Sequence, residues 1–315
     1  IEAKVARLKD EARHELASLD AQGGAIEAIG YMKSRLVESN TQRLNKIASK
    51  ETTVVGVNKF TTGEPSPLTA GDGGIMTVDP AVEQDQVDRL NAWRCARDDA
   101  SVASALRSLR AAAQAGENIM PASIAAAKAG VTTGEWAAQM RLIYGEYRGP
   151  TGVARGVSNK SEGLDEIREA VDLVSQKLGR RLGFLMGKPG LDGHSNGAEQ
   201  IAARARDCGM EIAYDGIRLT PEQLIASVQE HQPHVIGLSI LSGSHIPLVE
   251  DMMKRLQLAQ LDNIPVVVGG IIPQEDMTRL TAMGVAKIYT PKDFELNAIM
   301  MDIVSLADPT DLAAE

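Results

Sequence analysis

The residues best suited to chemistry lie in one glycine-rich loop, within the segment MGKPGLDGHSNGAEQIAARA at residues 186–205. Asp192 and His194 are two residues apart in this loop, between an apolar run and an amphipathic one. A strand, a glycine-rich loop and a helix usually hold a phosphate through backbone amides alone. The aspartate and the histidine therefore need another explanation.

The loop belongs to a repeating pattern of strands and helices that begins at Arg180. Apolar runs predict five strands, and amphipathic segments predict a helix after each strand. The expected strands cover residues 181–186, 211–216, 234–240, 264–270 and 287–290. Such a pattern is typical of an α/β fold whose parallel sheet is covered on both faces. We expect the flavodoxin-like (Rossmann-type) strand order 2-1-3-4-5.

In that order the first and third strands are neighbours, and their loops leave in opposite directions to form a crevice for ligands. The third strand ends at Ser239, and the fourth ends at Gly269 and Gly270. The fifth strand ends at Thr290. We therefore expect these residues to meet the loop Asp192–Gly197 at one rim of the sheet.

Four interpretations of Asp192 and His194 compete. A dinucleotide site would use Asp215 on a ribose, but the glycines of the loop do not spell G-x-G-x-x-G. A phospho-acceptor domain needs a carboxylate where Ser239 stands. A metal site could add His245 as a third ligand, yet a structural zinc needs four. The plainest interpretation is a surface histidine whose ring an aspartate holds.

Upstream of residue 180 the sequence is mainly helical. Residues 1–50 have apolar side chains at helical spacing, interrupted at Gly23 and Gly24. The β-branched run TTVVGVN, Thr52–Asn58, predicts a short buried strand. Proline and glycine predict a connector over 59–81 and a linker over 149–162. The helices expected between them cover 81–98, 99–116 and one or two short segments of 118–150, the last starting near Thr133.

Composition excludes several classes of function. The chain has 315 residues, 43% of them hydrophobic, and a formal net charge of −9 without a basic run. That charge, together with 3% aromatic residues, argues against nucleic-acid binding. No apolar stretch is long enough to suggest a membrane span, and no signal peptide is evident. The two cysteines, Cys95 and Cys208, are read as buried thiols of a cytoplasmic protein.

Three short motifs on successive strand ends point to one family. Asp192–Gly197 is D-x-H-x-x-G, Ser239–Leu241 is S-x-L, and residues 269–270 are a GG pair. Together they resemble the cobalamin-binding domain of adenosylcobalamin-dependent mutases. Upstream segments such as VVGVNKF and YGEYRGPTGV look more like ethylmalonyl-CoA mutases than methylmalonyl-CoA mutases. The resemblance runs over essentially the whole chain.

The resemblance implies a role for each motif. His194 would be the lower axial ligand of cobalt after the cofactor's own base has left, and Asp192 would hold the other ring nitrogen. Ser239 would hydrogen-bond the displaced nucleotide tail, and the glycines would leave room for it. The implied cofactor is adenosylcobalamin. Its expected contacts are Asp192, Gly193, His194, Ser195, Asn196, Gly197, Ile201, Ser239, Leu241, Gly243, Gly269, Gly270 and Thr290.

The resemblance also implies an isomerase that converts (2R)-ethylmalonyl-CoA to (2S)-methylsuccinyl-CoA by a radical rearrangement. In the family a (β/α)8 barrel of about 250 residues binds the acyl-CoA substrate. Only residues 1–60 of this chain would belong to that barrel, so no catalytic residue is assigned. We expect a truncated chain that binds the cofactor without turning over substrate. Residues 61–162 would be a connector and helical region, and residues 163–315 the cobalamin-binding domain.

Other readings of the resemblance stay open. The chain could belong to a methylmalonyl-CoA mutase. It could also be a corrinoid carrier, or a non-catalytic subunit that needs a separate barrel chain. As a mutase it is expected to form a homodimer, with no nucleic-acid or membrane partner.

Overall fold

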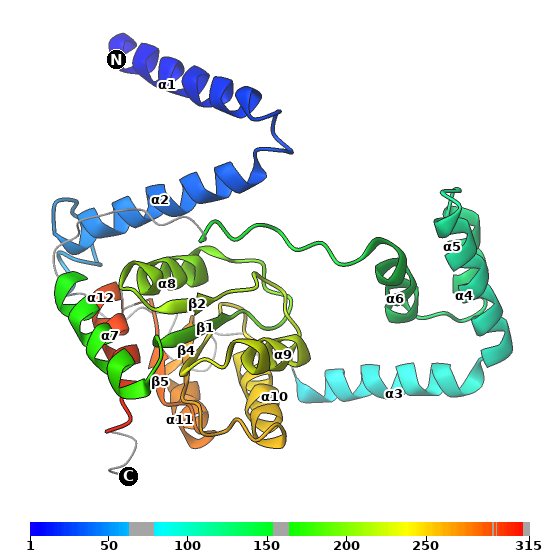
Figure 1. The fold of residues 1–315 in the computed structure, drawn as a ribbon. Helices are drawn as coiled ribbons and strands as arrows, with labels where there is room; N and C mark the ends of the chain where they lie inside the picture. The colour runs from blue at the N-terminus through cyan, green and yellow to red at the C-terminus, as the bar shows by residue number, and fades with distance from the viewer. Residues whose placement is uncertain (63–78, 154–163, 292, 294, 311–315) are drawn as a thin grey trace. The chain divides into compact units, whose positions relative to one another are not determined.

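The computed structural model describes residues 1–62, 79–153, 164–291, 293 and 295–310. The predicted connector and linker lie partly outside these ranges. The elements follow the predicted alternation (Figure 1). The helices are α1 (Glu2–Ala21), α2 (Ile29–Ala48), α3 (Pro80–Ala96), α4 (Asp99–Gln114), α5 (Met120–Lys128), α6 (Thr133–Tyr144), α7 (Leu164–Leu178), α8 (Asn196–Asp207), α9 (Pro221–His231), α10 (His245–Leu258), α11 (Gln274–Ala282) and α12 (Leu296–Leu306). The strands are β1 (Gly183–Gly187), β2 (Glu211–Ala213), β3 (Val235–Ile240), β4 (Val266–Gly270) and β5 (Lys287–Tyr289).

The five strands form one parallel sheet in the order β2-β1-β3-β4-β5, which confirms the predicted topology. β1 pairs with β3 in a register that sets Gly187 beside Leu238. β3 pairs with β4 so that Ser239 lies beside Gly269 and Ile240 beside Gly270. The ends of β1, β3 and β4 therefore meet at the same edge, where parallel α/β sheets bind ligands.

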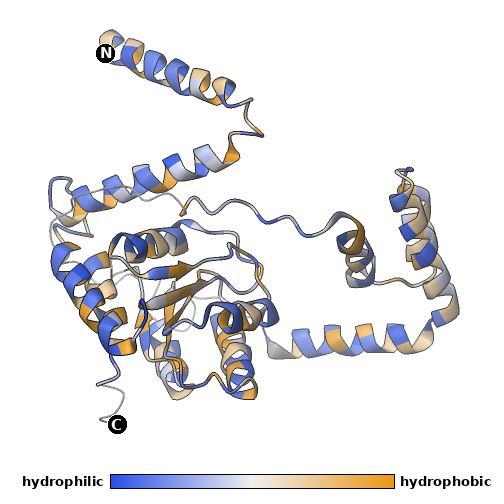
Figure 2. Ribbon diagram, viewed as in Figure 1, coloured by the Kyte–Doolittle hydropathy of each residue, from blue (hydrophilic) through white to orange (hydrophobic). Residues whose placement is uncertain are grey.

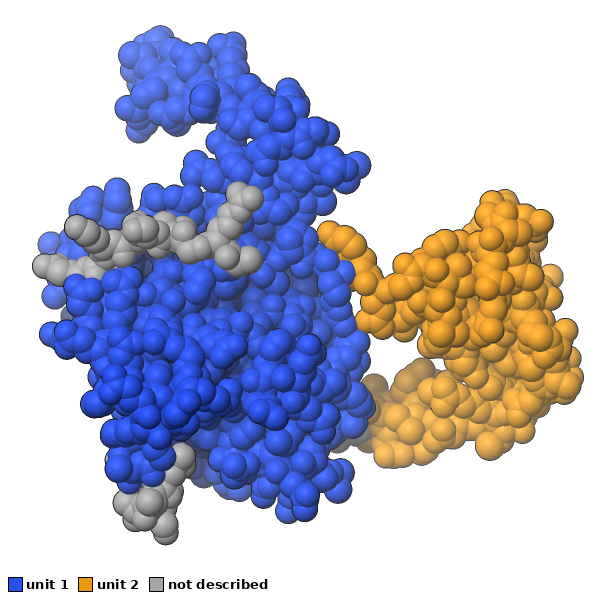
Figure 3. Space-filling view, in the orientation of Figure 1, with its two compact units in different colours: residues 1–62, 148–315 blue, residues 63–147 orange. Residues whose placement is uncertain are grey.

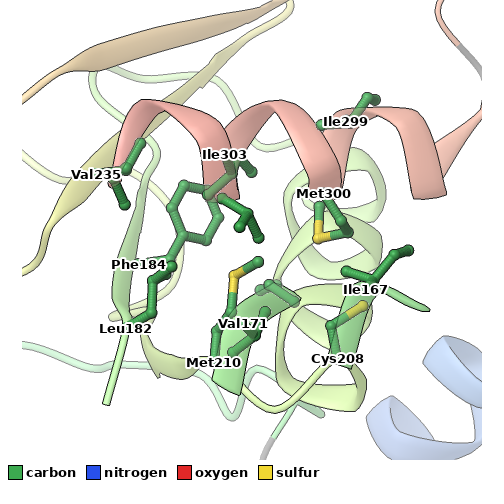
Figure 4. Close-up of a cluster of buried hydrophobic side chains, with 14 of the residues drawn as sticks. Ile167, Val171, Leu182, Phe184, Cys208, Met210, Val235, Ile299, Met300 and Ile303 are labelled. Carbon is green, nitrogen blue, oxygen red and sulfur yellow. The ribbon is translucent and has the colours of Figure 1, made fainter. Parts of the chain in front are cut away.

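Two apolar cores hold the sheet between its helices. On one face, side chains of α7, α8 and α12 pack against Phe184 and Met186 of β1 (Figure 4). On the other face, α9, α10 and α11 pack against Leu185 and the apolar residues of β3 and β4. The strands are accordingly rich in hydrophobic residues, whereas the helices alternate between hydrophobic and hydrophilic ones (Figure 2). This two-sided packing makes the carboxyl edge of the sheet a rigid platform.

The chain divides into two compact units (Figure 3). One combines residues 1–62 with residues 148–315, and the other comprises residues 63–147. Within the first unit, α2 packs against α8, so the N-terminal helices and the sheet share one body. The functional division of the chain into segments 1–60, 61–162 and 163–315 remains a prediction.

The expected strand Thr52–Asn58 is wrong. This segment forms a turn closed by a β-bridge between Val55 and Lys59, and Val55 is 73% exposed. The side chain of Asn58 explains the turn. Its amide oxygen accepts from Val54 N at 2.8 Å, and its amide nitrogen donates to the carbonyl oxygens of Ile47 and Thr52. An asparagine that satisfies the backbone locally competes with strand pairing.

The prediction that both cysteines are buried is confirmed for Cys208 and wrong for Cys95. Cys208 is buried, and that burial raises the pKa of its thiol to about 11, whereas Cys95 is exposed, against expectation. Over the described ranges, none of the helices combines the length and apolarity that crossing a bilayer requires.

The second unit is a small helical assembly in which Arg97, with 12% of its side chain exposed, links α3 to α6. Arg97 forms two hydrogen bonds with Glu135, at 2.7 and 2.6 Å, and also donates to the carbonyl oxygen of Gly130. Glu135 completes a capping box with Thr132, which is the N-cap in place of the expected Thr133. The Arg97 guanidinium lowers the pKa of Glu135 to about 2. One carboxylate therefore both caps α6 and fixes it to the end of α3.

Acid should destabilise this second unit through Glu135. Because the folded pKa of Glu135 lies below the unfolded value of about 4.3, its stabilisation is present above that value. It is lost as the pH falls towards 2. We expect the thermal midpoint of the second unit to fall by roughly 5 °C between neutral pH and about pH 3. Tryptophan fluorescence reports this unit selectively, because both tryptophans, Trp93 and Trp136, belong to it.

The Glu135→Gln variant should begin with a lower midpoint and lose most of the pH dependence. A matched control is Glu117→Gln, which changes an exposed glutamate of the same unit. Equal pH profiles for wild type and Glu135→Gln would contradict the assignment.

Candidate cobalamin site

The predicted Asp192 and His194 pair forms in the loop between β1 and α8. The ring Nδ1 of His194 lies 2.6 Å from Asp192 Oδ1, and the backbone nitrogen of His194 donates to the same oxygen at 3.0 Å. The Asp192 side chain is 3% exposed, whereas that of His194 is 78% exposed. A buried carboxylate thus holds an exposed imidazole by Nδ1, and Nε2 is the ring nitrogen left for a ligand.

Lys188 holds the other oxygen of the Asp192 carboxylate. Its ammonium is completely buried and lies 2.7 Å from Asp192 Oδ2, and it also donates to Ser239 O at 3.3 Å. Leu241 N donates to Asp192 Oδ2 at 3.1 Å. Burial raises the pKa of Asp192, but the Lys188 ammonium and the hydrogen bonds from His194 and Leu241 outweigh it and hold the pKa well below its usual range. Asp192 is therefore ionised and connects the ends of β1 and β3.

Sequence reasoning missed Lys188. Its position gives one usable signal, because a lysine directly after a buried strand lies four residues before the aspartate of the D-x-H motif. Lysine is rarely buried without an anionic partner. A lysine placed where the strand ends therefore needs a carboxylate nearby, and Asp192 provides it.

Beside this loop a cavity of about 310 Å³ opens at the carboxyl edge of the sheet. β1, β3, β4, β5, α8 and α12 contribute to its walls, which are mainly apolar. Among the predicted contacts, the cavity is lined by Asn196, Gly197, Ile201, Ser239, Leu241, Gly269, Gly270 and Thr290. Asn40 and Leu44 of α2, which sequence reasoning did not identify, also line it. The cavity is an apolar slot with polar groups at several points of its wall, the usual character of a small-molecule site.

The remaining predicted contacts lie in the surrounding loops. Gly193 and Gly243 are exposed, and Ser195 Oγ lies 3.4 Å from Lys33 Nζ. His245 does not join Asp192, because its Nε2 lies 2.9 Å from Asp276. Within the described part of the chain, no group of three or more His, Cys, Asp or Glu side chains is arranged to hold a metal ion. Asp215 lines a different cavity, together with Tyr31 and Tyr214.

The two glycines at the end of β4 have different reasons to be glycine. A Cβ on Gly270 would lie 1.8 Å from the carbonyl oxygen of Ile240, so the close approach of β3 and β4 requires glycine there. A Cβ on Gly269 would meet no atom within 4 Å, and the same holds for Gly197. Both open positions line the cavity. The absence of a side chain at Gly197 and Gly269 therefore enlarges the cavity. At Gly270 the absence of a side chain lets β3 and β4 pair closely.

Substitution by alanine should have opposite effects on stability at Gly270 and at Gly269. Gly270→Ala should lower the free energy of unfolding by about 1–3 kcal/mol or more, because the strands must move apart. Gly269→Ala should leave stability unchanged or raise it by up to about 1 kcal/mol, since alanine restricts the unfolded chain. Its methyl group would enter the cavity and weaken cobalamin binding by about tenfold or more. Chemical denaturation and a cobalamin titration of both variants test the pair. A loss of stability in Gly269→Ala would contradict the assignment.

Comparisons with known proteins agree with this geometry. Residues 1–146 match the family model described as methylmalonyl-CoA mutase, and residues 183–293 match the model described as B12 binding domain. The ethylmalonyl-CoA mutase of Cereibacter sphaeroides is 66% identical over 315 residues, which are 100% of this chain and 48% of that protein. The ethylmalonyl-CoA mutase of Methylorubrum extorquens is 51% identical over 310 residues, 98% of this chain and 45% of that protein.

The methylmalonyl-CoA mutase of Cereibacter sphaeroides is more distant, at 30% identity over 298 residues, 92% of this chain and 41% of that protein. The chain spans about half the length of the curated relatives it matches. Each half of the chain therefore has its counterpart in one group of enzymes. The chain belongs to the acyl-CoA mutase family that contains the ethylmalonyl-CoA and methylmalonyl-CoA mutases, and residues 183–293 are its B12 binding domain.

Proposed function

We propose that this chain is the cobalamin-binding part of an adenosylcobalamin-dependent mutase that converts (2R)-ethylmalonyl-CoA to (2S)-methylsuccinyl-CoA. The observation that carries the cofactor assignment is the exposed His194 imidazole, held through Nδ1 by a buried carboxylate beside an open apolar cavity. The substrate follows from similarity. Identity to the two ethylmalonyl-CoA mutases is 66% and 51%, whereas identity to the methylmalonyl-CoA mutase is 30%.

The residues present fit the cofactor. Imidazole is a natural ligand for cobalt, and His194 can offer Nε2 while Asp192 retains Nδ1. The Lys188 ammonium keeps Asp192 ionised, so the carboxylate stays a hydrogen-bond acceptor and selects the tautomer with the proton on Nδ1. His194 would therefore be the axial ligand, Asp192 its orienting partner and Lys188 the counter-charge.

The cavity fits the nucleotide tail. Gly197 and Gly269 leave open space along its wall, and Ser239, Asn196 and Thr290 supply polar groups around the apolar lining. A planar base can lie against apolar side chains while its sugar and phosphate meet the polar ones. The residues that line the crevice at the edge of β1, β3 and β4 would hold the tail, and the His194 loop would hold the cobalt-containing part of the cofactor.

When bound, adenosylcobalamin supplies a cobalt–carbon bond that breaks homolytically to start radical chemistry. This chain's residues bind the cofactor and orient it through His194. We propose that the acyl-CoA substrate is bound by a (β/α)8 barrel of the mutase, and that the whole enzyme is a homodimer. The free cysteines suit a reducing cytoplasm. A corrinoid carrier, a subunit paired with a separate barrel chain and a methylmalonyl-CoA mutase remain the alternatives.

A segment replacement tests the proposal. This chain would replace its matching segment in the Cereibacter sphaeroides ethylmalonyl-CoA mutase, with the rest of that enzyme kept. With adenosylcobalamin the hybrid should form methylsuccinyl-CoA from ethylmalonyl-CoA, and its His194→Ala variant should not. Conversion of methylmalonyl-CoA in preference would favour the other mutase. A hybrid that binds cofactor but rearranges neither substrate would favour a carrier.

A further inference from the structure

Helix α2 lies along α8 through a seam of buried polar contacts (Figure 1). Lys33 Nζ lies 2.6 Å from Glu199 Oε1, and Thr41 Oγ1 donates to Gln200 Oε1 at 3.0 Å. Gln200 Nε2 donates to Val37 O at 3.3 Å, and Arg204 donates to Asn45 Oδ1 at 2.9 Å. We call these contacts the α2–α8 seam. It consists of Lys33, Val37, Thr41 and Asn45 of α2 with Glu199, Gln200 and Arg204 of α8.

The seam fixes both the position and the rotation of α2. Its four α2 residues are spaced by four, so they form one stripe on the helix. Glu199, Gln200 and Arg204 are each less than 8% exposed, and these buried polar groups have partners on α2. A hydrogen-bonded polar contact of this kind is specific about register, because a shifted helix would leave buried groups unpaired. α2 is thus held in one place on α8.

In this position the next stripe of α2 faces the cofactor cavity. Asn40 and Leu44, again four residues apart, line the cavity together with Asn196, Gly197 and Ile201 of α8. Both side chains are half-buried. The helix therefore supplies a wall that the sheet and its own helices do not provide.

We infer that α2 is part of the cobalamin site, with Asn40 and Leu44 contacting the nucleotide tail. This inference rests on the proposed function. The tail is assigned because a cavity of about 310 Å³ can take a planar base and its sugar but not the far larger corrin ring. Leu44 covers the base with apolar surface, and the Asn40 amide can hydrogen-bond a polar group of the tail. The mutase portion of the chain thus helps to retain the cofactor.

The seam also connects this wall to the axial ligand. Lys33 Nζ lies 3.4 Å from Ser195 Oγ, next to His194. Gly152 also approaches α2, so closely that a Cβ there would lie 2.8 Å from the Lys33 carbonyl group. α2 therefore contacts both α8 and the chain around residue 152, beside the loop that carries His194.

Binding of two corrinoids to the full chain tests the inference. Adenosylcobalamin carries the nucleotide tail and cobinamide lacks it. The double variant Asn40→Ala/Leu44→Ala should bind adenosylcobalamin about tenfold more weakly than wild type and cobinamide within about twofold of wild type. Leu36→Ala is the matched control, because Leu36 lies on the same helix with 64% of its surface exposed. It should leave both affinities unchanged.

Three results would overturn the inference. They are an equal loss for both corrinoids, no loss for either, or a comparable loss in Leu36→Ala. If the double variant does not fold, Asn40→Ala alone should show the same selectivity at about threefold. If cobinamide binds too weakly to measure, amide hydrogen exchange of the wild type replaces the affinity comparison. Adenosylcobalamin should then slow exchange in residues 37–46, and unchanged exchange there would overturn the inference. A wild-type chain that binds neither corrinoid would overturn the proposed function as well. A wild type that binds adenosylcobalamin, with variants that show no selectivity between the two corrinoids, would overturn this inference alone.

Discussion

Replacing Lys188 with methionine should lower the free energy of unfolding of the sheet-containing unit by about 3–5 kcal/mol. The Lys188 ammonium is completely buried and its partner Asp192 is 3% exposed. Without the ammonium, the Asp192 carboxylate remains buried with backbone donors but no counter-charge. A buried charge that loses its partner is among the most destabilising changes known for single residues. Denaturation followed by circular dichroism measures the effect.

The chain offers a closely matched control for this variant. Lys254 and Glu250 are also four residues apart and also 2.7 Å from each other, but their side chains are 66% and 48% exposed. Lys254→Met should cost far less than Lys188→Met, because solvent already screens that pair. A double variant, Lys188→Met with Asp192→Asn, should recover much of the loss, since no unpaired charge is left. Similar costs for Lys188→Met and Lys254→Met would contradict the role given to burial.

Replacing His194 with alanine should separate binding from stability. The side chain is 78% exposed, so the free energy of unfolding should change by no more than about 0.5 kcal/mol. If His194 is the axial ligand that we propose, its removal should weaken adenosylcobalamin binding by about 100-fold or more, because even outer-shell partners of metal ligands contribute 10- to 100-fold. Absorbance titration measures the affinity and shows whether the cofactor's own base has left the cobalt.

Two variants define what the His194 result means. His231→Ala changes an exposed histidine at the end of α9 and should bind the cofactor like wild type. Asp192→Asn keeps an amide oxygen near the ring but removes the charge, and should weaken binding by about 10- to 100-fold. Unlike His194→Ala it should also lower stability, because it leaves the buried Lys188 ammonium unpaired. Wild-type affinity in His194→Ala would exclude cobalt coordination by this residue.

The sheet was predictable from sequence because each of its determinants is local. Apolar runs mark the strands, the capping box at Thr220 and Gln223 marks the start of α9, and Gly209, with a φ of +90°, follows the end of α8. Right-handed crossovers then leave few topologies, and the order 2-1-3-4-5 is the commonest of them for a sheet of this size. The loop with Asp192 and His194 had to lie at the carboxyl edge once that order was given.

The features that were missed depend on contacts between distant segments. The run Thr52–Asn58 has the composition of a strand, but the Asn58 side chain closes it into a turn. Lys188 looks like a surface lysine until the chain returns with Asp192. Asn40 and Leu44 reach the cavity only because a polar seam joins α2 to a helix more than 150 residues away. Periodicity along one helix does not reveal which partner it will meet.

The most direct test of the central claim is the electron paramagnetic resonance spectrum of cobalt(II) cobalamin bound to this chain, with its histidines labelled with 15N. The unpaired electron of cobalt couples to the axial nitrogen, so each cobalt line splits into three for 14N and into two for 15N. Coordination by His194 predicts triplets with the unlabelled chain, doublets with the labelled chain, and no protein-dependent splitting in His194→Ala. Triplets that persist with the labelled chain would show that the cofactor's own base still occupies the axial position, and would contradict the assignment of His194.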